Sequence, residues 1–224
     1  MSCAFCAAQN SVNEVSYLCG ECGLPQPLQP HENFFSVFGL PVRFTLSEAE
    51  IARLQSRFYE ASRGLHPDRF TRTANTQAQQ ASVERMSFLN QAWATLKNTA
   101  ERRQYVLKIE GLASAQQQAG AKNPAQFGSP DSPNSPVSME IAEDWFELQD
   151  LFLEDPAQAK VKSLELKNRI QATQQDLEEK IRANERDWDS AHTRANLESI
   201  HRLSQQLNTL RSLERDLLQK EAAL

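Results

Sequence analysis

The tripeptide His66-Pro67-Asp68 constrains the fold of this chain more than any other stretch. Proline has no backbone N–H and disfavours helical geometry at the residue before it, so a helix arriving at this point must end near His66. Helical sequence patterns flank the tripeptide, at residues 51–65 and 77–97. A helix, a polar turn and a second helix form an antiparallel hairpin with an exposed tip. Because Pro and Asp are common turn residues, the tripeptide alone is equally typical of a plain turn.

The two flanking segments carry apolar stripes that suit such a hairpin. The first opens with a capping box that runs from Ser47 to Glu50. Its stripe consists of Ile51, Leu54, Phe58, Ala61 and Leu65, and the stripe of the second segment consists of Val83, Met86, Leu89, Trp93 and Leu96. These spacings of three and four residues predict two helices that pack with their apolar faces against each other. Short helices at 33–38 and 100–110 complete a predicted four-helix unit.

Three neighbouring motifs place the tripeptide in a family context. They are Phe34-Phe-Ser-Val-Phe-Gly-Leu40-Pro, Asn90-Gln-Ala-Trp93-Ala-Thr-Leu96 and Arg102-Arg-Gln-Tyr105-Val-Leu107. Together with His66-Pro67-Asp68 they resemble the J-domain of the HscB family, which comprises co-chaperones of iron–sulfur cluster biogenesis. The resemblance covers about residues 33–112 and continues more weakly through the C-terminal third.

The resemblance implies a contact surface for a second protein, because J-domains stimulate ATP hydrolysis by DnaK-type chaperones. The residues that it assigns to contact with an HscA- or DnaK-type chaperone are His66, Pro67, Asp68, Arg53, Arg57, Arg63 and Arg69. Without the tripeptide, the arginines of this segment would be interpreted as an ordinary solvated helix face.

All four cysteines fall within the first 22 residues, as Cys3-x2-Cys6-x12-Cys19-x2-Cys22. Two Cys-x-x-Cys knuckles supply four thiolates, the ligand set of a tetrahedral structural Zn²⁺ site. Gly20 and Gly23 are expected to provide the tight backbone of the second knuckle. Two disulfides or a redox pair are the alternatives, and a cytosolic chain disfavours stable disulfides. We predict a zinc-ribbon-like module with a proline-rich linker over residues 1–30; some HscB-like proteins carry a similar module, chiefly eukaryotic ones.

Charge is distributed unevenly along the chain, whose net charge is -5. Residues 1–42 hold three acidic and no basic residues, 43–110 hold 11 basic and seven acidic, and 111–224 hold 13 basic and 19 acidic. This balance argues against nucleic-acid binding, and the cysteine module has no cation to meet a phosphate. No apolar run approaches the roughly 20 residues of a membrane span, and the N-terminus resembles neither a secretory signal nor a transit peptide. We therefore predict a bacterial-type cytoplasmic location.

Residues 113–137 separate two parts of the chain. They include four prolines and almost no large apolar residue, which predicts a flexible linker between a J-domain at 31–112 and a bundle at 138–224. The bundle should contain helices at about 138–153, 156–187 and 189–222. The apolar positions of its two long helices are Leu166, Ile170, Leu177, Ile181 and Trp188, then Leu197, Ile200, Leu203, Leu207, Leu210 and Leu217. These near-heptad repeats fit an antiparallel bundle, and a free coiled coil would explain the last two helices equally well.

The helix predicted at 138–153 carries two apolar stripes where packing on two neighbours requires one. One stripe is Ile141, Trp145, Leu148 and Phe152, and the other is Met139, Ala142, Phe146 and Leu153. The first contains the larger residues, so we expect it to face the core and the second to face solvent or a partner; a wide core face is the alternative.

The resemblance also suggests what that partner is. In the HscB family the matching helix binds the iron–sulfur scaffold protein IscU, and a gap-free match places this site on Met139, Ala142, Glu143 and Phe146.

The sequence as a whole predicts an all-α protein with a zinc-ribbon-like module, a four-helix J-domain and a C-terminal three-helix bundle. The resemblance implies a co-chaperone. Enzyme chemistry of its own is not expected, because the sequence shows no Gly-rich phosphate loop and no nucleophile in a recognisable setting. One alternative is a J-domain co-chaperone for a different client, with the C-terminal helices as a spacer or dimerisation coiled coil. Another is a zinc-ribbon and coiled-coil scaffold for nucleic acid, which the missing basic residues of 1–42 disfavour.

Overall fold

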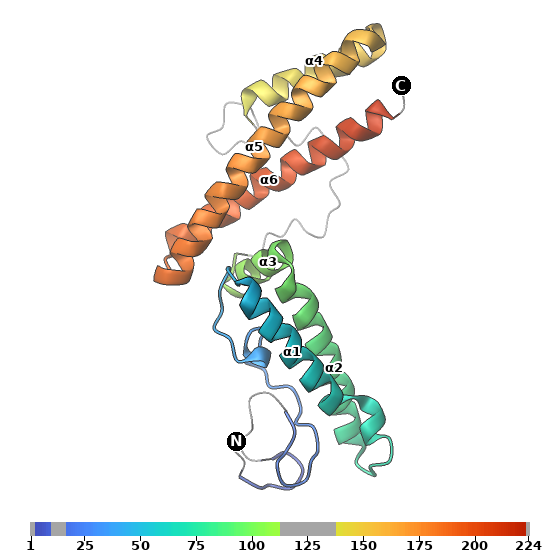
Figure 1. The fold of residues 1–224 in the computed structure, drawn as a ribbon, viewed down its shortest axis with the longest axis vertical. Helices are drawn as coiled ribbons and strands as arrows, with labels where there is room; N and C mark the ends of the chain where they lie inside the picture. The colour runs from blue at the N-terminus through green and yellow to red at the C-terminus, as the bar shows by residue number, and fades with distance from the viewer. Residues whose placement is uncertain (1–2, 10–16, 113–137, 223–224) are drawn as a thin grey trace. The chain divides into compact units, whose positions relative to one another are not determined.

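The computed structural model of the chain describes residues 3–9, 17–112 and 138–222. Over these residues the protein has six α-helices, two short 3₁₀ turns and no β-strand, which confirms the predicted all-α class. The chain divides into two compact units, Met1–Glu110 and Gly111–Leu224 (Figure 1). The linker predicted at 113–137 lies outside the described residues.

The first unit is built on the predicted hairpin. Helices α1 (Glu48–Leu65) and α2 (Thr76–Lys97) lie side by side, and the 3₁₀ turn η2 (Pro67–Phe70) follows the end of α1 (Figure 1). At the start of α1, Ser47 Oγ accepts a hydrogen bond from the Glu50 amide, and the Glu50 carboxylate accepts one from the Ser47 amide at 2.8 Å. The capping box and the helix end that Pro67 imposes are therefore both confirmed.

Two shorter elements complete this unit. Helix α3 (Thr99–Ile109) matches the prediction, whereas the helix expected at 33–38 is a single 3₁₀ turn, η1 (Ser36–Phe38). Gly39 ends this turn with a φ of 62°, a left-handed conformation that glycine adopts without steric cost.

The apolar stripe predicted for α2 is only partly correct. Leu89 and Leu96 are buried, but Met86 and Trp93 are half-buried and Val83 is 50% exposed. The buried face of α2 consists of Ala78, Ala81, Ser82, Arg85, Leu89, Ala92 and Leu96. Compared with the predicted stripe, this face is rotated around the helix towards small residues, because the chain that precedes α1 packs beside α2. Phe34 in that chain makes an edge-to-face contact with Phe88 of α2, with ring centroids 5.1 Å apart. On α1, Leu54, Ala61 and Leu65 are buried as predicted, and Ile51 and Phe58 are half-buried.

The second unit is a bundle of α4 (Met139–Glu154), α5 (Pro156–Ala191) and α6 (Arg194–Glu221). Asp155 caps α5 and Pro156 opens it, at the start predicted for this helix. Helix α4 packs along α5, and Lys220 of α6 places its amine 5.7 Å from the centroid of the Trp145 ring. Contact of α4 with both long helices favours the bundle over a free coiled coil.

The turn between the long helices lies four residues beyond the predicted break. His192 ends α5 in a left-handed conformation with φ 50°, and Thr193 caps α6 by accepting a hydrogen bond from the Asn196 amide. Neither Gly nor Pro marks this turn, which is why the break predicted at residue 188 is too early. The predicted apolar positions of α5 and α6 are buried except Leu203, which is half-buried.

Candidate functional site

The hairpin tip, residues 66–70, presents polar side chains to solvent. The His66 side chain is 54% exposed and that of Asp68 is 85% exposed. His66 Nδ1 accepts a hydrogen bond from the Asp68 amide at 3.4 Å, and Ser82 Oγ donates to the carbonyl of Leu65 at 2.7 Å. The imidazole and carboxylate therefore project from a backbone that is tied to α2, in an arrangement suited to contact with a macromolecule.

The arginines assigned to the chaperone contact lie at different distances from this tip. Arg63 and Arg69 are both near it, because Arg69 Nη1 donates to the Arg63 carbonyl at 3.1 Å. Arg57 is exposed, but its guanidinium also donates to the Phe38 carbonyl, so it anchors η1 to α1 as well. Arg53 lies about 20 Å from His66 along the helix axis, at the usual helical rise per residue. The structure thus groups Arg63 and Arg69 with His66 and Asp68, and places Arg53 well away from them.

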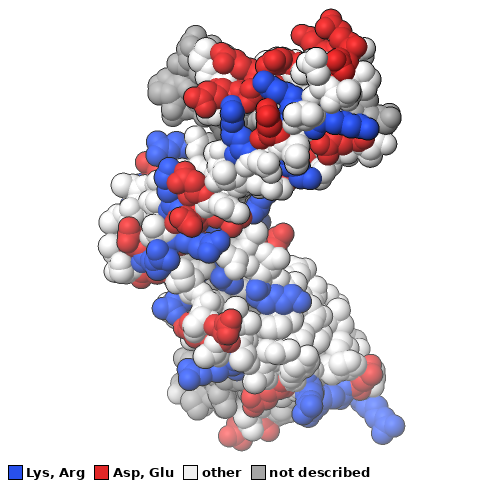
Figure 2. Space-filling model, turned by 45° about the horizontal axis from the view of Figure 1, so that its top comes forward, with Lys and Arg blue, Asp and Glu red and all other residues white. Residues whose placement is uncertain are grey.

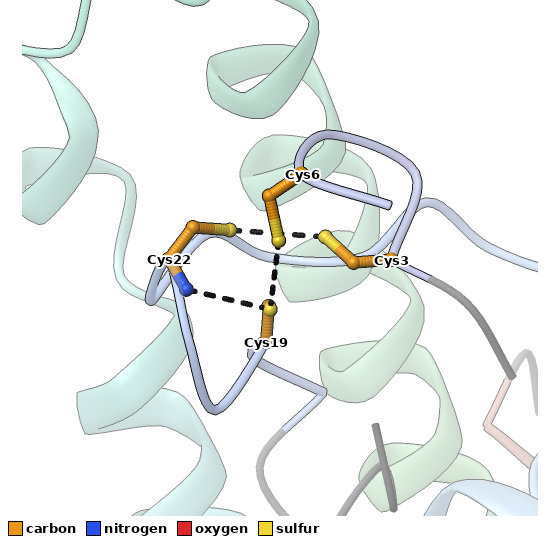
Figure 3. Close-up of side chains that lie close together, drawn as sticks. All are labelled: Cys3, Cys6, Cys19 and Cys22. Carbon is orange, nitrogen blue, oxygen red and sulfur yellow. Dashed lines mark hydrogen bonds between the residues drawn. The ribbon is translucent and has the colours of Figure 1, made fainter. Parts of the chain in front are cut away.

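The four cysteines form one cluster, as Figure 3 shows. Their Sγ atoms all lie within 4.8 Å of one another, with 3.7 Å between Cys3 and Cys22 and 3.6 Å between Cys6 and Cys19. A disulfide requires an S–S distance of about 2.05 Å, so these are free thiols. A tetrahedral zinc ion with Zn–S bonds of about 2.3 Å holds its sulfurs about 3.8 Å apart, close to the Cys3–Cys22 and Cys6–Cys19 separations.

The two knuckles repeat the same backbone geometry. In the first, the Ala7 amide donates to the Cys3 carbonyl at 3.1 Å; in the second, the Gly23 amide donates to the Cys19 carbonyl at 2.9 Å. Ala7 and Gly23 both adopt left-handed backbone conformations, with φ of 58° and 67°. The prediction for Gly23 is therefore confirmed. That for Gly20 is wrong, because Gly20 is not among the residues of positive φ.

Because the two knuckles share this geometry, we expect one substitution in each to change the free energy of unfolding in opposite directions. Ala7→Gly should stabilise the metal-bound module by about 1 kcal/mol, because it relieves the steric cost of a Cβ in the left-handed region. Gly23→Ala should destabilise it by a similar amount, although no atom lies within 4 Å of the added Cβ. Denaturant unfolding of the metal-loaded protein measures both. If both substitutions stabilised the protein, or if both destabilised it, the two knuckles would not be equivalent.

Hydrogen bonds to sulfur distinguish the four thiols. Burial opposes ionisation of Cys3, but N–H groups that include the Phe5 amide and the Gln26 side chain, each 3.3 Å from its Sγ, outweigh burial and lower its pKa to about 6. Burial raises the pKa of Cys22 to about 12. Donors to thiolate sulfur are characteristic of metal-ligating cysteines, whose ligating form is the thiolate. No sequence motif indicates the contact between Gln26 and Cys3.

The face of α4 that is predicted to contact a client protein is exposed to solvent. Met139 is 51% exposed, Phe146 60% and Leu153 87%, and Glu143 is exposed beside a half-buried Ala142. On the other face Ile141, Trp145 and Leu148 are buried and Phe152 is half-buried. The predicted division of α4 into a core face and an open face is therefore confirmed.

The open face has an acidic border. Residues 138–155 contain no Lys or Arg, and among the exposed acidic residues of this stretch Glu147 pairs with a cation of α5, Lys162, at 2.9 Å. The other exposed acidic residues of α4 are Glu140, Glu143, Asp150 and Glu154. A partner on this face would need an apolar surface with cationic groups around it.

One face of the molecule can be compared for charge in Figure 2. On the face drawn in Figure 2, basic and acidic side chains are interspersed, with no continuous basic field. Among the described residues, no helix has the length and apolar character required to cross a bilayer.

Two solved structures share the fold of this chain, although no family model matches it. The human co-chaperone protein HscB has a TM-score of 0.63 and 18% identity, and the match covers all of both chains. The chaperone HscB from Vibrio cholerae has a TM-score of 0.55 and 20% identity, over 85% of this chain and 99% of that chain. At these identities the likeness concerns the fold, and at that level it confirms the resemblance predicted from the motifs.

Proposed function

We propose that this protein is a J-domain co-chaperone of the HscB type that acts in iron–sulfur cluster biogenesis. The C-terminal bundle binds an IscU-type scaffold protein. The hairpin of the first unit docks on the ATPase domain of an HscA- or DnaK-type chaperone and triggers ATP hydrolysis. Hydrolysis closes the chaperone on the scaffold, and the cluster then passes to an apo-protein.

The observation that supports this proposal most strongly is the hairpin tip. His66 and Asp68 are both exposed at the turn between two packed helices, and Ser82 fixes the end of α1 behind them. Both side chains are more than half exposed, which suits activation of a partner's ATPase better than catalysis by this chain. We therefore propose that the protein is an activator and not itself an enzyme.

The proposed chaperone contact comprises His66, Pro67 and Asp68 with the nearby Arg63 and Arg69. Arg53 and Arg57 would extend it along α1, where both side chains are exposed. Guanidinium groups at the edge of an interface steer association with an acidic partner surface, so the association rate should fall as salt is added.

The proposed client contact is the open face of α4. Phe146 would be its aromatic anchor, with Met139, Ala142 and Glu143 around it, because an exposed aromatic residue on a rigid helix is the kind of group that dominates interface energies. Titrating the full chain with an IscU-type scaffold tests this choice. Saturable binding supports it. Absence of binding at high micromolar concentrations would favour a different client, with the bundle as a spacer or dimerising element.

We also propose that Cys3, Cys6, Cys19 and Cys22 hold one structural Zn²⁺. The matching sulfur spacing and the N–H donors to sulfur support this. The ion would cross-link a module that has little apolar core of its own, and so supply its folding energy. Four free cysteines also suit a reducing compartment, in keeping with the proposed bacterial-type cytoplasmic location.

Elemental analysis of protein purified without chelator provides a direct test of the metal. We expect one zinc per chain. Iron in place of zinc, or four titratable thiols with no metal, would overturn this prediction.

A further inference from the structure

The side chain of Gln26 connects the cysteine cluster to its surroundings. Its amide nitrogen donates to Cys3 Sγ at 3.3 Å and to the Leu24 carbonyl at 3.2 Å, while its oxygen accepts from the Ala4 amide at 2.9 Å. These partners fix the orientation of the amide, because the nitrogen meets two acceptors and the oxygen meets a donor. Gln26 is buried, so loss of this side chain would leave polar groups without their partners.

Arg85 continues the connection into α2. Its guanidinium donates to the Gln26 carbonyl, to the Pro27 carbonyl at 2.8 Å and to both carboxylate oxygens of Glu32 at 2.9 Å. The same group lies 4.2 Å from the centroid of the Tyr17 ring. Arg85 is only 3% exposed, and a buried guanidinium is strongly destabilising unless it is paired. All of these partners belong to residues 17–32, so the chain around the cysteines compensates a charge in the hairpin core.

The cysteine module also lies close to the last turn of α1. Leu18, which precedes the ligand Cys19, has its Cδ1 3.7 Å from the position of a Cβ built on Gly64, two residues before His66. On the other helix, Ser82 lies three residues from Arg85 and donates to the Leu65 carbonyl at 2.7 Å. The cluster is therefore connected to the end of α1 in two ways. One runs from Leu18 to Gly64, and the other runs from Gln26 through Arg85 and α2 to Ser82.

We infer that Gln26 and Arg85 are positioning residues through which metal binding at the cysteine cluster holds the hairpin tip in one conformation. With the metal bound, the knuckles fix Tyr17, Leu18 and Gln26, and these fix Arg85 and Gly64. Without it, the module loosens, Arg85 loses its compensating partners and the end of α1 frays. The inference rests on the proposed metal centre and does not depend on ATPase stimulation.

Hydrogen exchange of the full chain measures this link directly. Zinc added to the chelator-stripped protein should slow amide exchange at residues 61–70 at least tenfold. Exchange at residues 166–181 of α5, in the other unit, should not change and serves as the internal control. Equal exchange at 61–70 with and without zinc would overturn the inference while leaving the metal centre in place. Failure to take up zinc at all would overturn both.

Two matched substitutions test the route through Arg85. Arg85→Lys keeps a positive charge opposite Glu32 but loses the planar fork that reaches several acceptors at once. It should still bind zinc, and zinc should no longer slow exchange at the tip. Arg102→Lys is the control, because Arg102 is equally buried but donates to the Phe44 and Leu96 carbonyls. If zinc slows exchange at residues 61–70 as much in the Arg85→Lys protein as in the unmodified chain, the proposal is wrong.

Leu18→Ala provides a second test if Arg85→Lys fails to fold. It shortens the side chain that lies beside Gly64 without burying an unpaired charge. We expect the zinc-dependent protection at residues 61–70 to decrease severalfold. Undiminished protection in this variant would count against the proposed contact between module and tip.

Gln26→Ala tests the contact with the metal ligand itself. Loss of a hydrogen bond to a ligating group typically weakens metal binding about 10–100-fold. The cobalt-loaded variant should also show thiolate-to-metal charge-transfer bands at longer wavelength, because a thiolate without its donor is more easily oxidised. Gln29→Ala is the control, since Gln29 donates to the Pro27 carbonyl and has no contact with sulfur. Identical affinity and spectra for the Gln26 and Gln29 variants would refute the assignment of Gln26.

Discussion

His66→Gln should abolish stimulation of the partner ATPase and leave the fold unchanged. The side chain is 54% exposed, and its one described hydrogen bond is a 3.4 Å contact with the Asp68 amide. Substitution of such a surface residue usually changes the free energy of unfolding by no more than about 0.5 kcal/mol. Because the proposed contact uses the imidazole directly, glutamine should remove function without removing structure.

The measurement pairs helical content and thermal melting by circular dichroism with ATP turnover by the chaperone. Val83→Gln is a suitable control, because Val83 is also exposed on the hairpin but lies on the face of α2 turned away from the core. The control should stimulate turnover fully. A His66→Gln protein that stimulates as well as the unmodified chain would rule out the J-domain function.

The adjacent residues Trp145 and Phe146 should respond to truncation in opposite ways. Trp145 is 3% exposed, so Trp145→Ala should destabilise the bundle by about 3–5 kcal/mol. Phe146 is 60% exposed, so Phe146→Ala should barely change the melting temperature. An aromatic anchor that becomes buried in an interface contributes about 2 kcal/mol or more. Phe146→Ala should therefore weaken scaffold binding at least tenfold, which corresponds to about 1.4 kcal/mol.

Melts and scaffold titrations of the two variants separate these effects. A stable Phe146→Ala protein that binds the scaffold with unchanged affinity would remove Phe146 from the client contact. Leu153→Ala extends the comparison, because Leu153 is the most exposed residue of the same stripe, at 87%. Weaker binding in both variants would show that the contact covers the length of α4.

Local sequence chemistry explains why much of the fold could be predicted. Pro67 and the pair Asp155-Pro156 end or open helices through properties of proline itself, and the box from Ser47 to Glu50 is satisfied within four residues. The two faces of α4 follow from helical periodicity alone. Such features depend on residues close in sequence, and the structure places each as expected.

Contacts between distant residues could not be predicted in the same way. The apolar side chain of Val83 predicts a core position, yet Val83 is exposed. The charged Arg85 is buried instead, because Glu32, 53 residues earlier, lies beside it. Gln26 meets Cys3 across 23 residues. Similarly, no Gly or Pro marks the turn at His192, so the end of α5 could not be recognised from the sequence.

ATP hydrolysis by a DnaK-type chaperone in a single turnover tests the proposed function most directly. The full chain, added together with an IscU-type scaffold, should accelerate hydrolysis at least tenfold over the chaperone with scaffold alone, a barrier change of about 1.4 kcal/mol. A rate that stays constant up to saturating concentrations of the folded, metal-loaded protein, with a chaperone that responds to another J-domain protein, would contradict the proposal.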